Sequence, residues 1–187
     1  MPKKVVLLAS GNGTNAVNIC RFFYKDNEVD IMSVYTNNRL ARVIERVKEY
    51  GIKVEVFDNI FFDEGGLLKI ICSENPDLVV LAGFLLKLGP DWIQAFPDKI
   101  INIHPSLLPK YGGKGMFGKH VHQAVKRNKE KETGITIHYV NEAFDKGKII
   151  FQKKVEIDPD DTIEEIAFKV HQLEYRYFPK IIQKLLT

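Results

Sequence analysis

Short runs of apolar residues alternate along the chain with segments in which apolar positions recur at helical spacing. Apolar runs of roughly four to eight residues are typical of buried strands, and a period of about 3.6 residues is typical of amphipathic helices. We therefore predict strands at residues 5–9, 31–36, 53–57, 78–82, 100–104, 133–140 and 149–157. Helices are predicted at residues 15–24, 40–50, 64–74, 91–96, 118–128 and 162–186.

Several residues mark the ends of these elements. Thr162 and Glu165 have the spacing of a capping box, which indicates the start of the last helix. Gly51 follows the second helix at the position where a left-handed C-terminal cap favours glycine. Pro179 falls inside the last helix, and we expect it to bend or interrupt that helix.

The alternation of strands and helices is typical of βαβ units around a mainly parallel sheet. We predict an α/β fold of Rossmann-like type, with a twisted sheet and helices on both of its faces. The last two strands are joined by a turn, residues 141–147, so they should pair as an antiparallel hairpin at the C-terminal margin of the sheet. Neither a repeat nor a linker divides the chain, and we expect one domain over residues 1–187.

Composition narrows the classes of function. The net charge is only +3, and no basic stripe is interleaved with aromatic residues, so a nucleic-acid partner is not expected. No apolar run approaches the length of a membrane span. The two cysteines, Cys20 and Cys72, lack the spacing of a metal or redox motif, and no HExxH motif is present, so we expect no metal site and a cytoplasmic location. A monomer and a homodimer are equally compatible with the sequence.

The segment Ser-Gly-Asn-Gly-Thr-Asn, residues 10–15, joins the first predicted strand to the first helix. Backbone N–H groups at the start of a helix, with glycines that allow a close approach, form a site for an anion. The segment has neither the dinucleotide fingerprint nor the GK[ST] of a Walker A loop, which favours one phosphate monoester over a pyrophosphate. A glycine turn that only caps the helix is an equally good interpretation from the sequence.

Asn102 and His104 lie at the end of a predicted buried strand, which Pro105 terminates. Because side chains alternate along a strand, both point to the same face, at the sheet edge where α/β proteins bind ligands. Asp145 lies in the turn after the next strand and could reach this edge. A carboxylate beside the imidazole would favour the charged form and raise the pKa of His104. The alternative is a hydrogen-bonded core histidine, which is the commoner role of a lone histidine.

The remaining histidines offer weaker signals. His120 and His122 lie two apart on a predicted helix and should face different directions, and His138 should pack within its strand. His171 lies one helical turn from Glu174, and such a pair could bind the hydroxyls or the phosphate of a substrate. A surface pair without a ligand is the alternative for these two residues.

Four segments together resemble the phosphoribosylglycinamide formyltransferase family: SGNGTN at 10–15, PDLVVLAGF at 76–84, NIHPSLLPKYGG at 102–113 and GITIHYVNEAFDKG at 134–147. They occur in the family's order and span nearly the whole chain. The resemblance implies transfer of a formyl group from 10-formyltetrahydrofolate to the amine of 5′-phosphoribosylglycinamide, in purine synthesis. It also implies that Asn102, His104 and Asp145 are the catalytic residues.

The resemblance further implies which residues bind the two small-molecule substrates. The substrate phosphate and ribose would be bound by Gly13, Thr14, Asn15, His171 and Glu174. The folate would be bound along Leu85, Leu86, Lys87 and Leu88, with Asn102. Two features depart from the family's pattern: residues 111–120 form a longer, glycine-rich loop, and Ile60 stands where some members have an arginine near the folate tail.

Other functions remain open on the same residues. A sugar-amine formyltransferase or a formyltetrahydrofolate hydrolase of this fold would use a similar Asn, His and Asp. A tRNA-dependent formyltransferase would be expected to carry an additional C-terminal domain. A nucleotide-binding α/β protein without catalytic activity would keep the glycine loop but would not need Asn102, His104 and Asp145 together.

Overall fold

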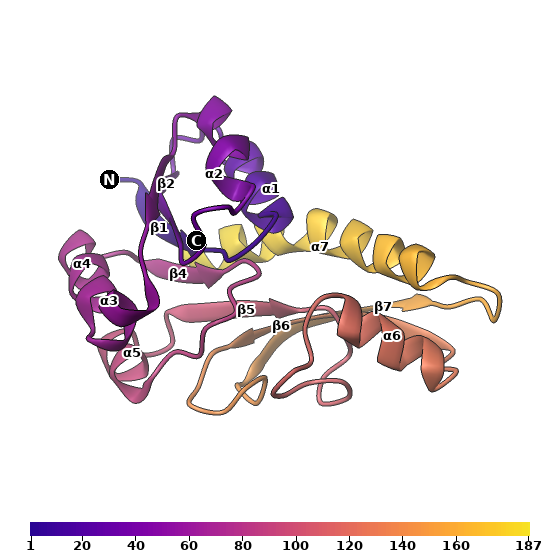
Figure 1. Ribbon diagram of the computed structural model, residues 1–187. Helices are drawn as coiled ribbons and strands as arrows, with labels where there is room; N and C mark the ends of the chain where they lie inside the picture. The colour runs from indigo at the N-terminus through magenta and orange to yellow at the C-terminus, as the bar shows by residue number, and fades with distance from the viewer.

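The computed structural model describes residues 1–187 and contains one seven-stranded sheet with helices packed on it (Figure 1). The strand order is β3-β2-β1-β4-β5-β6-β7. The strands are β1 (Lys3–Leu8), β2 (Val29–Thr36), β3 (Lys53–Val56), β4 (Leu78–Leu81), β5 (Ile100–His104), β6 (Glu132–Tyr139) and β7 (Ile149–Glu156). The helices are α1 (Thr14–Phe22), α2 (Val43–Arg46), α3 (Asn59–Asp63), α4 (Gly66–Glu74), α5 (Pro90–Ala95), α6 (Lys119–Arg127) and α7 (Ile163–Leu186).

The sheet is parallel from β3 to β5 and antiparallel from β5 to β7. The predicted α/β architecture and its antiparallel C-terminal margin are therefore confirmed. The pairing of β5 with β6 places Asn102 opposite His138 and His104 opposite Thr136. This register brings side chains from distant parts of the sequence to one end of the sheet.

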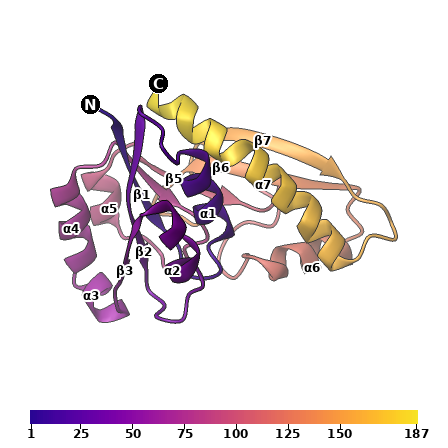
Figure 2. The ribbon, with the colours of Figure 1, turned by 90° about the horizontal axis from the view of Figure 1, so that it is seen from above.

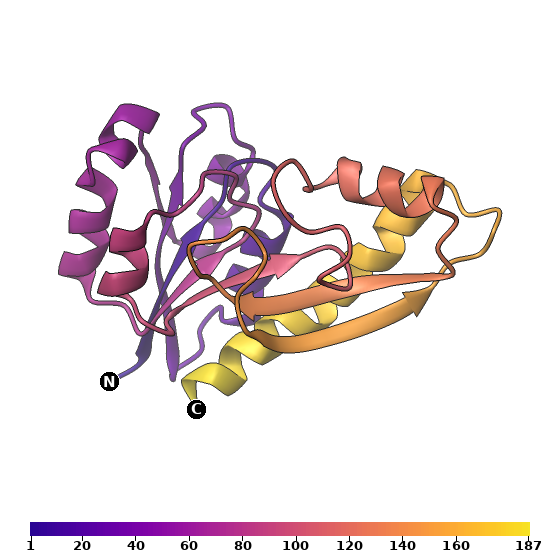
Figure 3. The same cartoon turned by 90° about the horizontal axis from the view of Figure 1, so that it is seen from below.

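Alternating residues of the central strands pack into two separate cores, because successive side chains point to opposite faces. Val5 and Leu7 of β1 belong to the core under α1 and α7, which cover one face (Figure 2). Val6 and Leu8 belong to the core under α3, α4 and α5, which cover the opposite face (Figure 3). Helices thus lie on both faces of the sheet, as the sequence predicts.

One predicted helix differs from the structure, and one short helix is not among those predicted. The helix expected at residues 40–50 is two short elements, α2 and a 3₁₀ turn, η1 (Lys48–Tyr50). Gly51 closes the second of them with a φ of 71°, as its predicted capping role requires. Ahead of α4 stands the short helix α3, which has its own start signal: the Asp58 side chain accepts a hydrogen bond from the N–H of Phe61.

Pro179 does not interrupt α7, which runs unbroken from Ile163 to Leu186. Proline removes the N–H that would bond the carbonyl four residues earlier. That carbonyl, of Tyr175, instead accepts a hydrogen bond of 2.9 Å from Nδ2 of Asn18 on α1. The predicted capping box of Thr162 and Glu165 is confirmed at the start of the helix. None of the helices combines the length and the apolar character that a membrane crossing requires.

Candidate active site

A cavity of about 620 Å³ opens at the carboxyl ends of β1, β4 and β5. Ligands of open α/β sheets bind at this edge, where loops follow the parallel strands. The cavity is lined by the glycine loop after β1, the segment after β4, the end of β5, the turn before β7 and one side of α7. All twelve residues that the sequence indicates for catalysis or binding line this one cavity.

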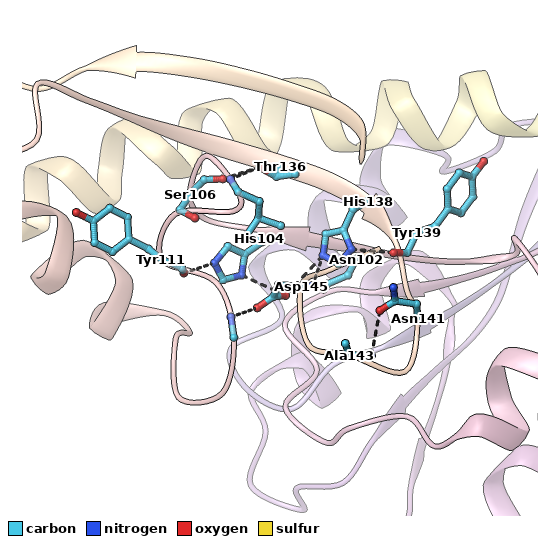
Figure 4. Close-up of polar contacts among 12 residues, drawn as sticks. Asn102, His104, Ser106, Tyr111, Thr136, His138, Tyr139, Asn141, Ala143 and Asp145 are labelled. Atoms are coloured by element: carbon cyan, nitrogen blue, oxygen red, sulfur yellow. Dashed lines mark hydrogen bonds and ion pairs between the residues drawn. The ribbon is translucent and has the colours of Figure 1, made fainter. Parts of the chain in front are cut away.

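Asn102, His104 and Asp145 all line the cavity and lie close together with His138 (Figure 4). Asp145 Oδ1 lies 3.6 Å from His104 Nδ1 and 3.6 Å from His138 Nε2. Figure 4 shows the carboxylate between the two imidazole rings, which come from the neighbouring strands β5 and β6. Asn102 Nδ2 lies 3.3 Å from His138 Nε2.

Both ring nitrogens of His104 face hydrogen-bond acceptors. Nε2 donates to the Tyr111 carbonyl at 2.7 Å, and Nδ1 faces the Asp145 carboxylate. In His138, Nδ1 donates to the carbonyl of Tyr139 at 2.9 Å, so Nε2 of its neutral form can accept from Asn102. The surroundings of His104 therefore provide partners for both N–H groups of an imidazolium.

The net pKa shift of His104 is nevertheless opposite to the one expected from the sequence. Burial lowers its pKa below the usual value, and the charge of Asp145 and the Tyr111 carbonyl offset this only in part. For Asp145, burial acts to raise the pKa, but the neighbouring His138 ring, the charge on His104 and the N–H of Gly113 together lower it. The free cavity thus contains a carboxylate beside a largely neutral imidazole.

The turn between β6 and β7 positions Asp145. Asp145 itself has a φ of 56°, and its Oδ2 accepts a hydrogen bond of 2.9 Å from the N–H of Gly113 in the glycine-rich loop. Gly147 closes the turn so tightly that a Cβ at this position would overlap the carbonyl oxygen of Tyr139. The glycine is required here for the close approach of two backbones.

The glycine loop after β1 lines the cavity beside the start of α1. Gly13 has a φ of 65°, and a Cβ there would overlap Val43 of α2, so the loop depends on glycine at this position. Asn15 Nδ2 donates to Glu174 Oε2 at 3.0 Å, and His171 Nδ1 lies 2.9 Å from the same oxygen. The bond to Glu174 raises the pKa of His171 despite its burial, which favours a charged pair.

The segment after β4 also lines the cavity. Leu85 is 53% exposed although it is apolar, and Leu88 is buried against the core below it. The ammonium of Lys87 lies 5.7 Å from the ring centre of Phe144, which belongs to the turn before β7. Ile60 is 69% exposed on α3 and is not among the residues that line the cavity.

Sequence reasoning missed two residues of this site. His138 is buried as predicted, but it also contacts Asn102 and Asp145 rather than only packing in its strand. His122 lines the cavity and is 3% exposed, whereas His120 is exposed on the other side of α6. His138 and Thr136 lie two residues apart on β6, which indicates that their side chains share one face of the sheet. That His138 meets Asn102 depends on the pairing of β6 with β5, which the local sequence does not reveal.

The glycine-rich loop, residues 111–120, forms part of the cavity wall through residues 113–118. Gly113, Gly115 and Gly118 all have positive φ angles. The loop is anchored at its start, where the Tyr111 hydroxyl donates to Glu130 at 2.9 Å and accepts from Asn128 at 2.8 Å. No group of three or more His, Cys, Asp or Glu side chains in residues 1–187 is arranged to hold a metal ion.

Comparisons with known proteins agree on one family. A family model described as formyl transferase matches residues 3–182. The phosphoribosylglycinamide formyltransferase of Bacillus subtilis strain 168 is 35% identical over 190 residues, which cover 98% of this chain and 95% of the relative. The protein of the same name from Haemophilus influenzae is 36% identical, over 97% of this chain and 86% of the relative.

Solved structures extend this likeness to the fold. The crystal structure of phosphoribosylglycinamide formyltransferase from Streptococcus pneumoniae TIGR4 matches with a TM-score of 0.87 and 32% identity over 99% of both chains. The structure of the protein of that name from Bacillus halodurans matches with a TM-score of 0.89 and 36% identity, over 99% of this chain and 96% of that one.

Proposed function

This chain belongs to the formyl transferase family, and on that premise we propose that it transfers a formyl group from 10-formyltetrahydrofolate to the amine of 5′-phosphoribosylglycinamide, a step of purine synthesis. We also propose that residues 1–187 act as one domain, since all seven strands join one sheet. The observation that carries the proposal is the meeting of Asn102, His104 and Asp145 in one cavity that the glycine loop and the apolar segment after β4 also line.

The end of the cavity beside α1 suits the phosphate and ribose of the glycinamide substrate. Backbone N–H groups at Gly13, Thr14 and Asn15 begin a helix and favour a phosphate. The pair of His171 and Glu174 adds a cation and a carboxylate, which can bind the phosphate and the ribose hydroxyls respectively. The amine of the substrate would then extend toward His104.

The end of the cavity beside β4 suits the folate. Its wall is apolar along Leu85, Leu86 and Leu88. The N–H of Leu85 donates to Ser10 Oγ, so the pterin would pair with the other backbone groups of this segment. The volume of about 620 Å³ is within the usual range for a site that takes small molecules. The folate supplies the formyl group, which it carries on a nitrogen atom.

Asn102 and His104 are suited to stabilise charge that develops on the formyl oxygen during attack by the amine. The Asn102 amide has two N–H bonds, and only one is directed to His138. When protonated, His104 is a second donor, and Asp145 stabilises its charge from 3.6 Å. Because the site is buried, these donors act with little competition from water.

The same residues can move the proton that the reaction requires. The attacking amine loses a proton, which Asp145 can accept through a water molecule. His104 can deliver a proton to the folate nitrogen as the formyl group leaves it. The proton that Asp145 accepts then passes to His104, whose Nδ1 lies 3.6 Å away, and replaces the proton that His104 delivered. The proton lost at one nitrogen is thus gained at the other, and both side chains return to their starting state.

Incubation of the protein with 10-formyltetrahydrofolate and 5′-phosphoribosylglycinamide tests the proposal, with folate release followed by absorbance. Release should depend on both substrates and should match the formylated product one to one. Release that continues without the amine would indicate a hydrolase instead. If the protein formylates a sugar amine but not the ribonucleotide, this would indicate a sugar-amine formyltransferase of this fold.

A further inference from the structure

His122 is a buried histidine that no part of the proposed chemistry uses. It lies in the first turns of α6, directly after the glycine-rich loop, and lines the cavity while only 3% exposed. Its Nδ1 is enclosed and has no hydrogen-bond partner, which leaves Nε2 as the nitrogen that can meet a ligand. Buried polar atoms without a partner are rare in proteins and cost stability, so such a side chain calls for a functional explanation.

The neighbours of His122 place it at the ribonucleotide end of the cavity. Its ring lies 6.3 Å from the ring of His171, at an angle of 75°. His171 contacts Glu174, and Asn15 donates to that same carboxylate. Both contacts use Oε2 of Glu174, so Oε1 remains free to accept a hydrogen bond from a ligand.

The charge state of His122 determines which group of the substrate this side chain can bind. Burial lowers its pKa to about 4, and the nearby charge of His171 acts in the same direction, so His122 is neutral at neutral pH. A hydroxyl both donates and accepts, and so it can pair with Nε2 in either tautomer of a neutral imidazole. A phosphate is better matched by charged His171 and by the N–H groups of the glycine loop.

We propose that His122 binds the ribose of the glycinamide substrate, through a hydrogen bond between one ribose hydroxyl and Nε2, while the other hydroxyl donates to Oε1 of Glu174. This inference rests on the proposed function and names a specificity-determining contact within it. His122 would therefore distinguish a ribosyl substrate from one that lacks a hydroxyl, without taking part in the transfer of the formyl group.

The substitution His122→Phe tests this contact, because it keeps a ring of similar size and removes both nitrogens. Titration calorimetry should show that the Kd for 5′-phosphoribosylglycinamide rises about three- to tenfold, the effect of one lost hydrogen bond. The KM for this substrate should rise equally, with the KM for the folate and kcat unchanged. The matched control His120→Phe changes an exposed histidine on the same helix and should leave all four values unchanged.

Analogues of the substrate identify the group that His122 meets. The wild-type protein should bind the 2′-deoxy and 3′-deoxy analogues less tightly than the parent, and His122→Phe should lose its discrimination against one of them. Loss of affinity that is equal for the parent and both analogues would overturn the ribose assignment and indicate the phosphate. An unchanged Kd would overturn the contact altogether.

Thermal unfolding separates a binding role from a structural one. Because Phe removes an enclosed nitrogen that has no partner, the Tm of the free variant should equal or exceed that of the wild type. A lower Tm together with weaker binding of both substrates would mean that His122 only supports the fold. If the wild-type protein does not bind the ribonucleotide, the proposed function is wrong. If the wild-type protein is active and His122→Phe has the same Kd and KM, only the proposed contact of His122 is wrong.

Discussion

Oδ1 of Asp145 lies 3.6 Å from Nδ1 of His104, and both side chains are almost entirely buried. Burial lowers the pKa of His104, so the attraction of Asp145 for its charged form does not outweigh desolvation in the folded protein, and the pair contributes little net stability. Substitution of only one of the two residues, however, leaves the other polar side chain buried without its partner. The arrangement is therefore better explained by control of the proton on His104 than by stabilisation of the fold.

The substitutions His104→Ala and Asp145→Asn should each lower kcat by at least about a hundredfold, the usual contribution of a positioned acid or base. His104→Ala removes a donor and proton carrier, and Asp145→Asn removes the charge that stabilises the imidazolium. Steady-state assays with both substrates measure the effect, and circular dichroism checks that the variants fold. His120→Ala, at an exposed position on α6, is the control. Turnover at the wild-type rate in either site variant would refute the assigned roles.

The turn that positions Asp145 can be tested without a change to any polar group. Gly147→Ala introduces a Cβ that overlaps the Tyr139 carbonyl oxygen, so the turn must shift and carry Asp145 with it. We expect a loss of about 1–3 kcal/mol of stability and a lower kcat. Denaturant unfolding and initial-rate assays measure the two effects. The control is Gly89→Ala, which should behave as wild type, because Gly89 has a φ of −77° and no atom lies within 4 Å of the place that the added methyl group would occupy.

Most of the fold and the central part of the site could be predicted from the sequence, because their signals are local. The strand at residues 100–104 is found with those bounds, since a run that begins with apolar residues ends at a proline. The face shared by Asn102 and His104 follows from strand geometry alone. The helix predicted at residues 40–50 is wrong because its apolar periodicity does not reveal where the backbone must turn around the glycine loop.

Features that depend on non-local pairing could not be predicted. His138 joins the site only because β6 pairs antiparallel to β5 in a register that sets it opposite Asn102. The net pKa shift of His104 depends on the depth of its burial, which competes with the charge of Asp145. The continuity of α7 through Pro179 depends on a donor from α1, which lies far away in the sequence.

Lys87 offers a cation at the folate end of the cavity. Lys87 and Lys114 are the only lysines or arginines among the lining residues, and the Lys87 ammonium lies over the Phe144 ring. Lys87→Met should raise the KM for 10-formyltetrahydrofolate by about two- to fivefold at low salt. The rise in KM should be smaller at high salt, because salt screens the attraction of an exposed charge. The effect should be absent with a folate analogue that lacks the glutamate carboxylates.

A matched substitution separates this contact from a general loss of positive charge. Lys69→Met removes an exposed lysine on α4, outside the cavity, and should leave the KM for the folate unchanged. Equal effects of the two substitutions, or an equal rise in KM for the analogue without carboxylates, would exclude a specific contact between Lys87 and the folate tail.

His122 should make the stability of the free protein depend on pH below neutrality. Its pKa falls from the usual 6.5 to about 4 on folding, so between these values the unfolded chain binds a proton that the folded protein does not. Stability contributed by this group is therefore constant above about pH 7 and declines as the pH falls toward 4, by up to about 3 kcal/mol. Denaturant unfolding at pH 7.5 and pH 5 measures the decline in the wild type and in His122→Phe. The difference between the two pH values should be smaller in the variant, and a decline of the same size in both proteins would show that other groups cause it.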